Sequence, residues 1–311
     1  MSYLLIGNYG VGNLGDEALK DYFLMQYPQA SFKVISANPV EGEVPRLPCG
    51  FRSIFKPWWK TLNALRKSRG MVFGGGSLFT DIESPRACLI WWWHAFVARL
   101  FGKKIYLTFQ GIGPFKTGVG EWCARWVVKR SVFISVRDNL SFDRIKDWKK
   151  NTNVVQTCDP IISLINNENP ESCSQNILIV IPRNNSSESF LEALMDIKQR
   201  GRDQIRFLSL NPASGKELEL CTRMSMSLGM ETEIIPIKTL GELIAEISKG
   251  KTVLTQRYHG ALVAIALGKE VQIVMQGEGD KLSALKNIDR SKILELYTRG
   301  EEALTVNLSA S

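Results

Sequence analysis

Short apolar runs alternate with helical patterns along the whole chain, and this alternation constrains the fold more than any other feature. Such runs have the length of buried strands, and the segments between them place apolar residues at helical spacing. Strands that alternate with helices are typical of parallel α/β layers. In the first half we predict strands at residues 3–7, 32–36, 71–73, 104–109, 132–136 and 154–157, and helices at, for example, 17–26 and 121–129.

A polar, turn-rich segment at residues 166–172 divides this pattern and is predicted to be a linker. Behind it we predict strands at 177–181, 205–210, 233–237, 252–254 and 271–275, with helices near 188–200, 215–228, 240–249 and 260–267. The sequence therefore predicts two Rossmann-like domains, residues 1–165 and 174–311, facing each other across a cleft. The last helix could pack back on the N-terminal domain. In open parallel sheets ligands bind beyond the carboxyl ends of the strands, so functional residues are expected there.

Composition narrows the class of protein. Apolar residues make up 44% and charged residues 23%, as in soluble globular proteins. The first apolar run has no Lys or Arg before it and is too short for a signal peptide, which predicts a cytoplasmic protein. Six cysteines are scattered without a CxxC pair, which favours free thiols over a zinc site.

The net charge of +8 does not by itself indicate which kind of molecule the protein binds. The 39 basic residues are interleaved with 31 acidic ones and form no basic block, so a nucleic-acid partner is not expected. A moderately positive surface suits anionic small substrates or a lipid face. Residues 88–101 are aromatic and apolar but include His94 and Arg99 and fall short of the roughly 20 residues that span a bilayer. We predict a buried or half-buried helix there, in preference to an interfacial anchor.

A glycine-rich loop follows the first predicted strand. Its glycines at 10, 12 and 15 fit the dinucleotide pattern G-x-G-x-x-G. Asp16 and Glu17, however, place two carboxylates where a pyrophosphate would sit, and the second strand ends without an acid for a ribose. These observations argue against a nicotinamide site. Helix capping and the binding or deprotonation of a sugar hydroxyl both remain open for the two carboxylates.

Three further strand ends of the first half carry polar or glycine-rich segments. Residues 74–81 open with three glycines, which suit either a tight turn or the close approach of a ligand. Asp81 at the end of this segment is a candidate for a sugar-hydroxyl partner or a helix cap. Residues 110–114 are predicted to be a third loop, and Arg137 with Asp138 is predicted to form an internal ion pair.

The second half supplies cations at its strand ends. Arg183 follows the strand at 177–181, and Arg257 follows the strand at 252–254. Guanidinium groups suit bidentate binding of phosphate or carboxylate, so the two arginines together predict an anionic ligand. Of the two histidines, His94 is predicted to be packed, while His259 beside Arg257 is a candidate general acid or base or a helix-start hydrogen-bond partner. Carboxylates in one half and cations in the other suit a neutral polyol facing a multiply charged anion.

Six motifs in order resemble the polysaccharide pyruvyl transferase family over most of the chain. They are residues 7–18 (GNYGVGNLGDEA), 74–81 (GGGSLFTD), 110–114 (QGIGP), 136–141 (VRDNLS), 158–160 (CDP) and 256–259 (QRYH). The last is similar to the family's Met-Arg-Leu-His motif, with Tyr258 in place of leucine. Residues 276–281 (QGEGDK) match the family's Asp-Pro-Lys only loosely, and both departures concern the acceptor more than the chemistry.

The resemblance implies a GT-B-like fold and a transferase that uses phosphoenolpyruvate as donor. Arg257 and His259 would face the donor, joined by Arg183 and Tyr258, while Gly12, Asn13, Gly75, Gly76, Asp81 and Gln110 would belong to the substrate site. Asp16 and Glu17 would act with His259 in catalysis, without metal or cofactor. The product would be a cyclic pyruvate ketal on a glycan or lipid-linked saccharide, made in the cytoplasm, with peripheral association at the inner face of the membrane.

Two other functions stay open on the sequence. A glycosyltransferase with a nucleotide-sugar donor would share the fold and would also bring cations to phosphates. A non-catalytic glycan-binding relative could retain the same residues without turnover. Titration with UDP or GDP against phosphoenolpyruvate separates the first, and the absence of phosphate release would favour the second.

Overall fold

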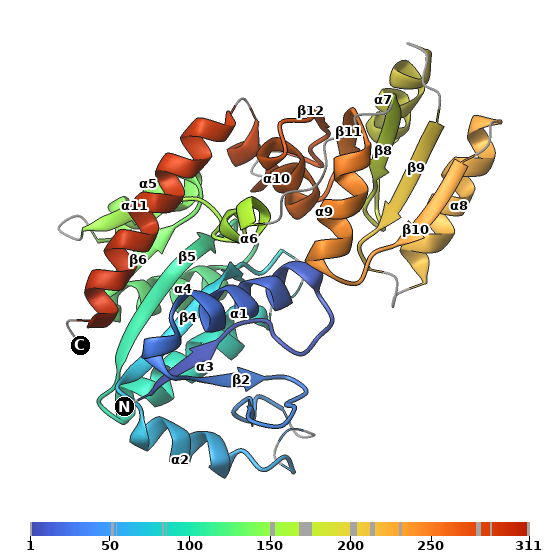
Figure 1. Ribbon diagram of the computed structural model, residues 1–311. Coiled ribbons are helices and arrows are strands. Elements are labelled where there is room, and N and C mark those ends of the chain that lie inside the picture. Colours follow the sequence, from blue (N-terminus) through green and yellow to red (C-terminus); the bar gives the residue numbers. More distant parts are fainter. Residues whose placement is uncertain are drawn as a thin grey trace. The chain divides into compact units, whose positions relative to one another are not determined.

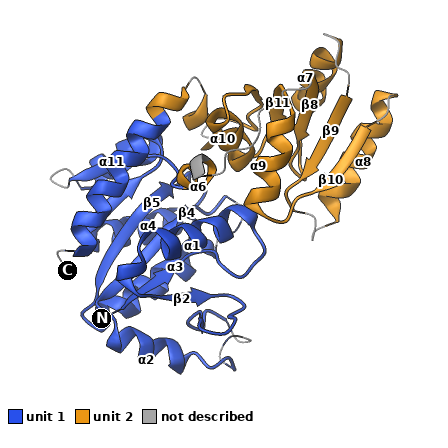
Figure 2. Ribbon diagram, in the orientation of Figure 1, with its two compact units in different colours: residues 1–160, 293–311 blue, residues 161–292 orange. Residues whose placement is uncertain are grey.

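The computed structural model (Figure 1) describes residues 2–50, 53, 55–82, 84, 86–149, 153–167, 176–199, 204–211, 215–229, 232–277, 281–286 and 288–309. The chain divides into two compact units, residues 1–160 with 293–311 and residues 161–292 (Figure 2). The sequence placed the division between residues 165 and 174. Most of the predicted linker, 168–172, lies outside the described residues.

The first unit contains a seven-stranded sheet in the order β3-β2-β1-β4-β5-β6-β7. Every neighbouring pair in it is parallel. The carboxyl ends of its strands therefore share one edge. The strands are β1 (Tyr3–Ile6), β2 (Phe32–Ser36), β3 (Val44–Pro45), β4 (Gly70–Phe79), β5 (Lys104–Ile112), β6 (Phe133–Val136) and β7 (Val154–Gln156).

Helices cover both faces of this sheet. One face carries the apolar core that α2 (Trp59–Lys67), α3 (Ala87–Leu100), α4 (Gly118–Arg130) and α5 (Asn139–Trp148) share with the strands. On the other face lie α1 (Leu14–Gln26) and α11 (Arg290–Ser309), which meet through the rings of Tyr22 and Tyr297 (Figure 1). A 3₁₀ helix, η1 (Pro28–Ala30), follows α1.

The last helix belongs to the first unit although its sequence follows the second. Thr157 Oγ1 donates to Leu296 O at 3.0 Å, and Tyr3 OH donates to Leu308 O at 3.2 Å. Gly300 lies so close to β7 that a Cβ there would come within 2.9 Å of the Phe109 ring and still closer to Thr157. A glycine is required at this crossing because there is no room for a side chain.

The second unit is a smaller parallel sheet in the order β10-β9-β8-β11-β12. Its strands are β8 (Ile177–Ile181), β9 (Gln204–Ser209), β10 (Thr232–Pro236), β11 (Thr252–Thr255) and β12 (Glu270–Ile273). Its helices are α6 (Ile162–Asn167), α7 (Glu188–Gln199), α8 (Lys216–Leu228), α9 (Leu240–Lys249), α10 (Tyr258–Ala266) and the 3₁₀ helix η4 (Lys281–Leu285). Local sequence sets their ends: Thr239 caps α9, and Gly229 ends α8 in the left-handed conformation.

All eleven predicted strands are present, and the expectation of parallel α/β layers is confirmed. Two predicted loops are wrong. β4 runs on through the glycines at 74–76, and β5 runs on through Gln110 to Ile112. Both segments are buried on both faces, so they lack the alternation that marks a strand, and their glycines are residues typical of turns. The two-residue strand β3 was not predicted.

The aromatic helix is a core helix, as predicted. Cys88, Trp91, Ala95 and Ala98 of α3 are buried against the sheet. Among the described helices, none is both long and apolar enough to cross a membrane.

Candidate functional site

The glycine loop after β1 is closed by a tyrosine that folds back over the sheet. Tyr9 is 1% exposed, and its hydroxyl donates to Gly74 O of β4 at 2.9 Å. A Cβ on Gly7 or Gly74 would collide with the Tyr9 ring or hydroxyl, so glycine is required at both positions. Burial, with the carboxylates of Asp16 and Glu17, raises the pKa of Tyr9 well above its ordinary value, which keeps this donor protonated.

The two carboxylates that follow this loop make different contacts. The cap of α1 is Asn13, whose side chain accepts from the backbone of Gly15 and Asp16. Glu17 uses both oxygens within the chain: one accepts from Gly10 N at 2.7 Å and the other pairs with Lys20 at 2.8 Å. Asp16 accepts from Asn8 Nδ2 at 3.0 Å, and its other oxygen lies 3.2 Å from where a Cβ on Gly76 would stand. Asp16 thus faces the glycine segment of β4.

Arg46, which sequence analysis missed, donates hydrogen bonds to this glycine-rich loop. Arg46 Nη2 donates to Gly7 O at 3.1 Å and to Asn8 Oδ1 at 3.2 Å, and its guanidinium lies 4.8 Å from the centre of the Trp91 ring. Asn8 therefore bridges Arg46 and Asp16. Burial lowers the pKa of Arg46, opposed by the negative charge of Asp16. No pattern in the sequence marks Arg46, which stands in an irregular segment after β3.

The segment at 74–81 begins with glycines, two of which have positive φ values, and ends at a buried aspartate that accepts hydrogen bonds. Gly75 and Gly76 adopt φ values of +80° and +83°, which L-residues with side chains rarely adopt. Asp81 is buried and accepts from Lys116 N at 2.6 Å, from Thr117 N at 2.9 Å and from the Thr117 hydroxyl. Burial alone would raise the pKa of Asp81, but these hydrogen bonds outweigh it and hold the pKa below its usual range. Asp81 anchors the start of α4, and its predicted contact with substrate stays a prediction.

A bulge in β5 orients the next predicted site residue. Phe109 has φ of +52° at the register shift between Leu107 and Gln110, and its N–H donates to Ser135 Oγ at 2.8 Å. Gln110 is fully buried and donates from Nε2 to Phe73 O and Thr108 O, both at 3.1 Å. Its Oε1 has no hydrogen-bond partner in the part of the chain that the structure describes.

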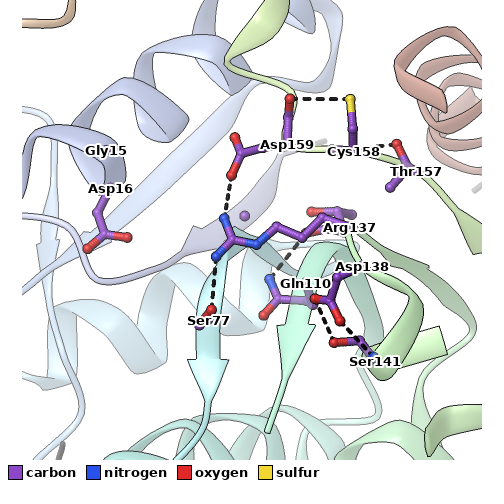
Figure 3. Close-up of polar contacts among 12 residues, drawn as sticks. Gly15, Asp16, Ser77, Gln110, Arg137, Asp138, Ser141, Thr157, Cys158 and Asp159 are labelled. Atoms are coloured by element: carbon purple, nitrogen blue, oxygen red, sulfur yellow. Dashed lines mark hydrogen bonds and ion pairs between the residues drawn. The ribbon is translucent and has the colours of Figure 1, made fainter. Parts of the chain in front are cut away.

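A buried ion pair ties three strand ends together (Figure 3). Arg137, after β6, pairs with Asp159, after β7, and donates from Nη2 to Ser77 Oγ of β4 at 2.9 Å. Only 3% and 0% of these two charged side chains is exposed. The predicted partner of Arg137 is wrong: Asp138 instead caps α5 through Ser141 N at 2.7 Å. In Figure 3 Asp16 lies apart from this cluster, at the start of α1.

In the second unit the two predicted arginines stand at matching positions on neighbouring strands. The last registered pair of β8 and β11 is Ile181 with Thr255, and Arg183 and Arg257 each follow it by two residues. Gln256 N also donates to Ile181 O at 3.1 Å, which keeps the two strands together beyond that pair. Arg183 Nη1 donates to Gln276 Oε1 at 3.1 Å. The structure therefore brings both guanidinium-bearing residues to one end of one strand pair.

A buried glutamate holds Arg257 in place. Glu217, in the first turn of α8, has no exposed side chain; it accepts from Leu210 N at 2.7 Å and pairs with Arg257 Nη2. Arg257 remains 24% exposed, although its Nε is buried. The guanidinium is thus fixed at one nitrogen and retains donors for an anion. Sequence analysis missed Glu217, because a glutamate in a first helical turn is common.

His259 stands in the first turn of the helix that Arg257 caps. Arg257 occupies the N-cap of α10, followed by Tyr258 and His259. Tyr258 is 4% exposed and meets His259 edge to face, with ring centres 5.5 Å apart. His259 is half-buried. His259 therefore follows Arg257 by two residues, at a helix N-terminus that favours anions.

The remaining histidine and four of the cysteines, Cys88, Cys123, Cys158 and Cys221, are buried. His94 accepts from Leu47 N at 2.9 Å and donates from Nδ1 to Ile90 O at 2.8 Å, so the prediction that it is packed is confirmed. Burial lowers the pKa of His94 to about 4. Cys49, Cys88, Cys123, Cys158 and Cys221 are free thiols, and Cys173 lies outside the described residues. Within the described ranges no three His, Cys, Asp or Glu side chains gather as metal ligands.

Solved structures share this fold at low sequence identity. Anabaena Alr3699/HepE, in a complex with UDP and glucose, matches with a TM-score of 0.62 over 100% of both chains at 10% identity. Methanocaldococcus jannaschii UDP-GlcNAc 2-epimerase gives the same score, coverage and identity. S. aureus MnaA, bound to UDP, matches at 0.58 and 14% identity over 97% of this chain and 91% of its own. The protein thus has the GT-B-like fold of two Rossmann-like units, as predicted.

The chain belongs to the polysaccharide pyruvyl transferase family, whose model matches residues 13–272. This range includes five of the six motifs completely and the second half of the first. Among curated protein sequences, none matches the chain. Family and fold together support a transferase of polysaccharide biosynthesis.

Proposed function

We propose that the protein transfers a pyruvyl group from phosphoenolpyruvate to a sugar of a cell-surface polysaccharide precursor, forming a cyclic pyruvate ketal. The observation that carries this proposal is the pair of arginines at matching positions after β8 and β11, with His259 in the adjoining helical turn. Phosphoenolpyruvate carries a phosphate and a carboxylate on the same carbon, C2, and two guanidinium groups match two such anions.

The donor site is assigned to the second unit. Arg183 and Arg257 would bind the carboxylate and the phosphate, and would stabilise charge on the phosphate as it leaves. Glu217 orients Arg257 and balances part of its charge, because it is buried and bonded to both Arg257 and Leu210 N. Tyr258 would form part of the wall beside His259.

The reaction balances without a metal or cofactor. A sugar hydroxyl oxygen attacks C2 of the enol phosphate while C3 takes a proton and becomes a methyl group. A second hydroxyl oxygen then bonds to C2 as the C2–O bond to phosphate breaks, which closes the ketal ring. Of the two hydroxyl protons, one is matched by the proton gained at C3 and the other leaves with phosphate. We assign delivery of the proton to His259.

The acceptor site is assigned to the glycine-rich edge of the first unit. Asp16 would accept the hydroxyl proton, because it is held by Asn8 and faces Gly76. Glu17 is the weaker candidate, since both its oxygens already bond within the chain. Gly12, Asn13, Gly75, Gly76, Asp81 and Gln110 remain proposed substrate residues. The proposal includes a lipid-linked saccharide acceptor, and so a cytoplasmic protein at the inner face of the membrane.

A phosphate-release assay tests the proposal. Phosphoenolpyruvate is offered with a panel of hexoses, N-acetylhexosamines and their lipid-linked forms, and products are examined by mass spectrometry for a pyruvyl ketal. We expect phosphate release that depends on one acceptor class. Release of no phosphate with any acceptor, in protein that binds glycan, would favour the non-catalytic relative.

A nucleotide-sugar glycosyltransferase is the second candidate, because structures of the same fold hold UDP. Calorimetric titration separates the two. We expect heat from phosphoenolpyruvate that disappears in Arg257→Met; heat from UDP or GDP alone would replace the proposal with this candidate.

A further inference from the structure

The outer sides of α3 and α4 carry a cluster of aromatic rings that extends from the core, against which Trp92, Phe96 and Trp126 pack, to the exposed Trp122. Trp92 of α3 lies 5.3 Å from Phe96 and 5.6 Å from Trp122 of α4, between ring centres, and Phe96 lies 5.9 Å from Trp126. Trp122 is 53% exposed, and Leu89, three residues before Trp92 on α3, is 41% exposed. We call this surface, defined by Leu89, Trp92, Phe96, Trp122 and Trp126, the aromatic face.

Packing against the core accounts for Trp92, Phe96 and Trp126, but not for the exposed Trp122 and Leu89. The inner sides of the same helices already fill the core with smaller residues, such as Cys88 and Ala95 of α3 and Ala124 and Val127 of α4. An exposed tryptophan and leucine on adjoining helices add no core contact and expose apolar surface at a cost. Such a patch marks a surface that meets a partner.

The charges on α3 and α4 are nearly all positive. Arg86 is the N-cap of α3 and Arg99 lies in its last turn, and Arg125, Lys129 and Arg130 lie on α4, all exposed. Glu121 is the single acidic residue in the two helices. The Arg130 guanidinium lies 4.0 Å from the centre of the Trp126 ring. Half-exposed tryptophans amid arginine and lysine suit the headgroup level of an anionic bilayer, where indole rings and basic side chains are both stabilised.

The position of this surface relates it to the acceptor edge of the same unit. Both helices follow strands whose carboxyl ends form that edge, and the first residues of α4 are tied to it by Thr117 and Asp81. Trp122 stands about one helical turn beyond Thr117. A bilayer that touches the aromatic face therefore lies beside the end of the sheet that carries the glycine segments.

We propose that the aromatic face docks on an anionic phospholipid bilayer, with Trp122 and Leu89 inserted at headgroup level and the basic residues on lipid phosphates. The proposal deepens the proposed function, because it supplies the surface on which a lipid-linked acceptor would be met. The docking itself rests on residues outside the donor and acceptor sites.

Co-sedimentation of the full chain with vesicles tests the proposal. The vesicles are made of phosphatidylcholine alone or mixed with phosphatidylglycerol. We expect binding that requires the anionic lipid and weakens with salt. Trp122→Gln should weaken it roughly fivefold to tenfold, from the lost apolar burial. Arg125→Gln with Lys129→Gln should weaken it about fivefold for each charge removed.

Matched variants on α2 control for the nonspecific effect of removing an exposed tryptophan or two positive charges from the surface. Trp59 is 59% exposed, and Lys60 and Lys67 are exposed, yet they lie outside the aromatic face. Trp59→Gln, and Lys60→Gln with Lys67→Gln, should leave vesicle binding within twofold. Circular dichroism confirms that each variant folds. Phosphate release with a soluble acceptor should be unchanged in Trp122→Gln, so failure of docking and failure of the reaction are distinguishable.

Three results would overturn the proposal. They are no binding to anionic vesicles at low salt, equal loss in the α2 variants, and a dimer in analytical ultracentrifugation that Trp122→Gln dissociates. The last would assign the aromatic face to a second copy of the chain.

Discussion

The carboxyl edges of the two sheets are built from the same strand arrangement but hold their charges differently. In the first unit the charged groups are largely bonded to the chain: Arg137 and Asp159 are buried together, and Asp81 anchors the start of α4. In the second unit Arg257 is fixed by a buried glutamate and yet stays 24% exposed. One edge is a rigid frame around glycine segments, and the other presents cations. The difference suits a neutral acceptor on the first edge and an anionic donor on the second.

The largest effect is expected when the imidazole of His259 in the second unit is removed. His259→Ala should lower kcat by about 10²–10⁴-fold, because a positioned proton donor typically contributes that much. Binding of phosphoenolpyruvate, measured by calorimetry, should change little, since the arginines remain. A variant that keeps near-normal kcat would contradict the proton-transfer role.

Removing one cation should affect binding as well as turnover. Arg257→Met is expected to lower kcat/KM by about 10²–10³-fold, from the loss of an oriented charge at the phosphate. Glu217→Gln should raise the KM for phosphoenolpyruvate more than it lowers kcat, since it loosens Arg257 without removing it. Arg223→Met, at an exposed position on α8, is the matched control. Equal effects at 223 and 257 would remove Arg257 from the donor site.

The two histidines sharpen the comparison through pH. The unfolded chain protonates His94 below about pH 6.5, whereas the folded chain keeps it neutral down to about pH 4. The free energy of unfolding should therefore fall by up to about 3 kcal/mol from His94 alone as the pH drops through this window. Urea titrations at several pH values measure the effect, and His94→Asn should flatten the slope. An unchanged slope in that variant would argue that other groups cause the acid sensitivity.

The acceptor edge can be tested by separating its two carboxylates. Asp16→Asn should lower turnover about a hundredfold, at the lower end of the contribution of a general base, with donor binding retained. Glu17→Gln should have the smaller effect on turnover and a larger one on the order of the loop, because Glu17 holds Gly10 N. Steady-state kinetics in the acceptor decide between them, and the reverse ranking would make Glu17 the base.

Replacing glycine by alanine usually stabilises a helix, but at Gly300 of α11 we expect it to destabilise the first unit. Gly300→Ala would gain helix propensity of about 1 kcal/mol elsewhere, but here a Cβ meets Thr157 and the Phe109 ring. We expect a net loss of about 2 kcal/mol in the free energy of unfolding. Gly118→Ala, in the first turn of α4 with open space around it, should be neutral or stabilising. Denaturant melts of both variants check this, and matched stabilities would mean that α11 shifts to accept the methyl group.

Much of the fold could be predicted because strand length and helical spacing depend on residues that are close together in the sequence. The eleven predicted strands are all present, since each buried run is bounded by turn residues or by an amphipathic helix. The glycine segments at 74–76 and 110–112 were predicted as loops because glycine has no side chain to indicate a buried face of a strand. Pairing between β4 and β5 nevertheless continues through both segments. Local composition could not show this.

The sequence by itself determined the parallel α/β layers, the pair of arginines and the histidine at strand ends, and the family motifs. Only the tertiary structure decided which charge meets which. Arg137 pairs with Asp159 and Arg257 with Glu217, 22 and 40 residues away. The position of Arg46 under the glycine loop is of the same kind. Periodicity reports which face a residue turns to the core, but an ion pair depends on which distant strands become neighbours, and that follows from the packing of the whole sheet.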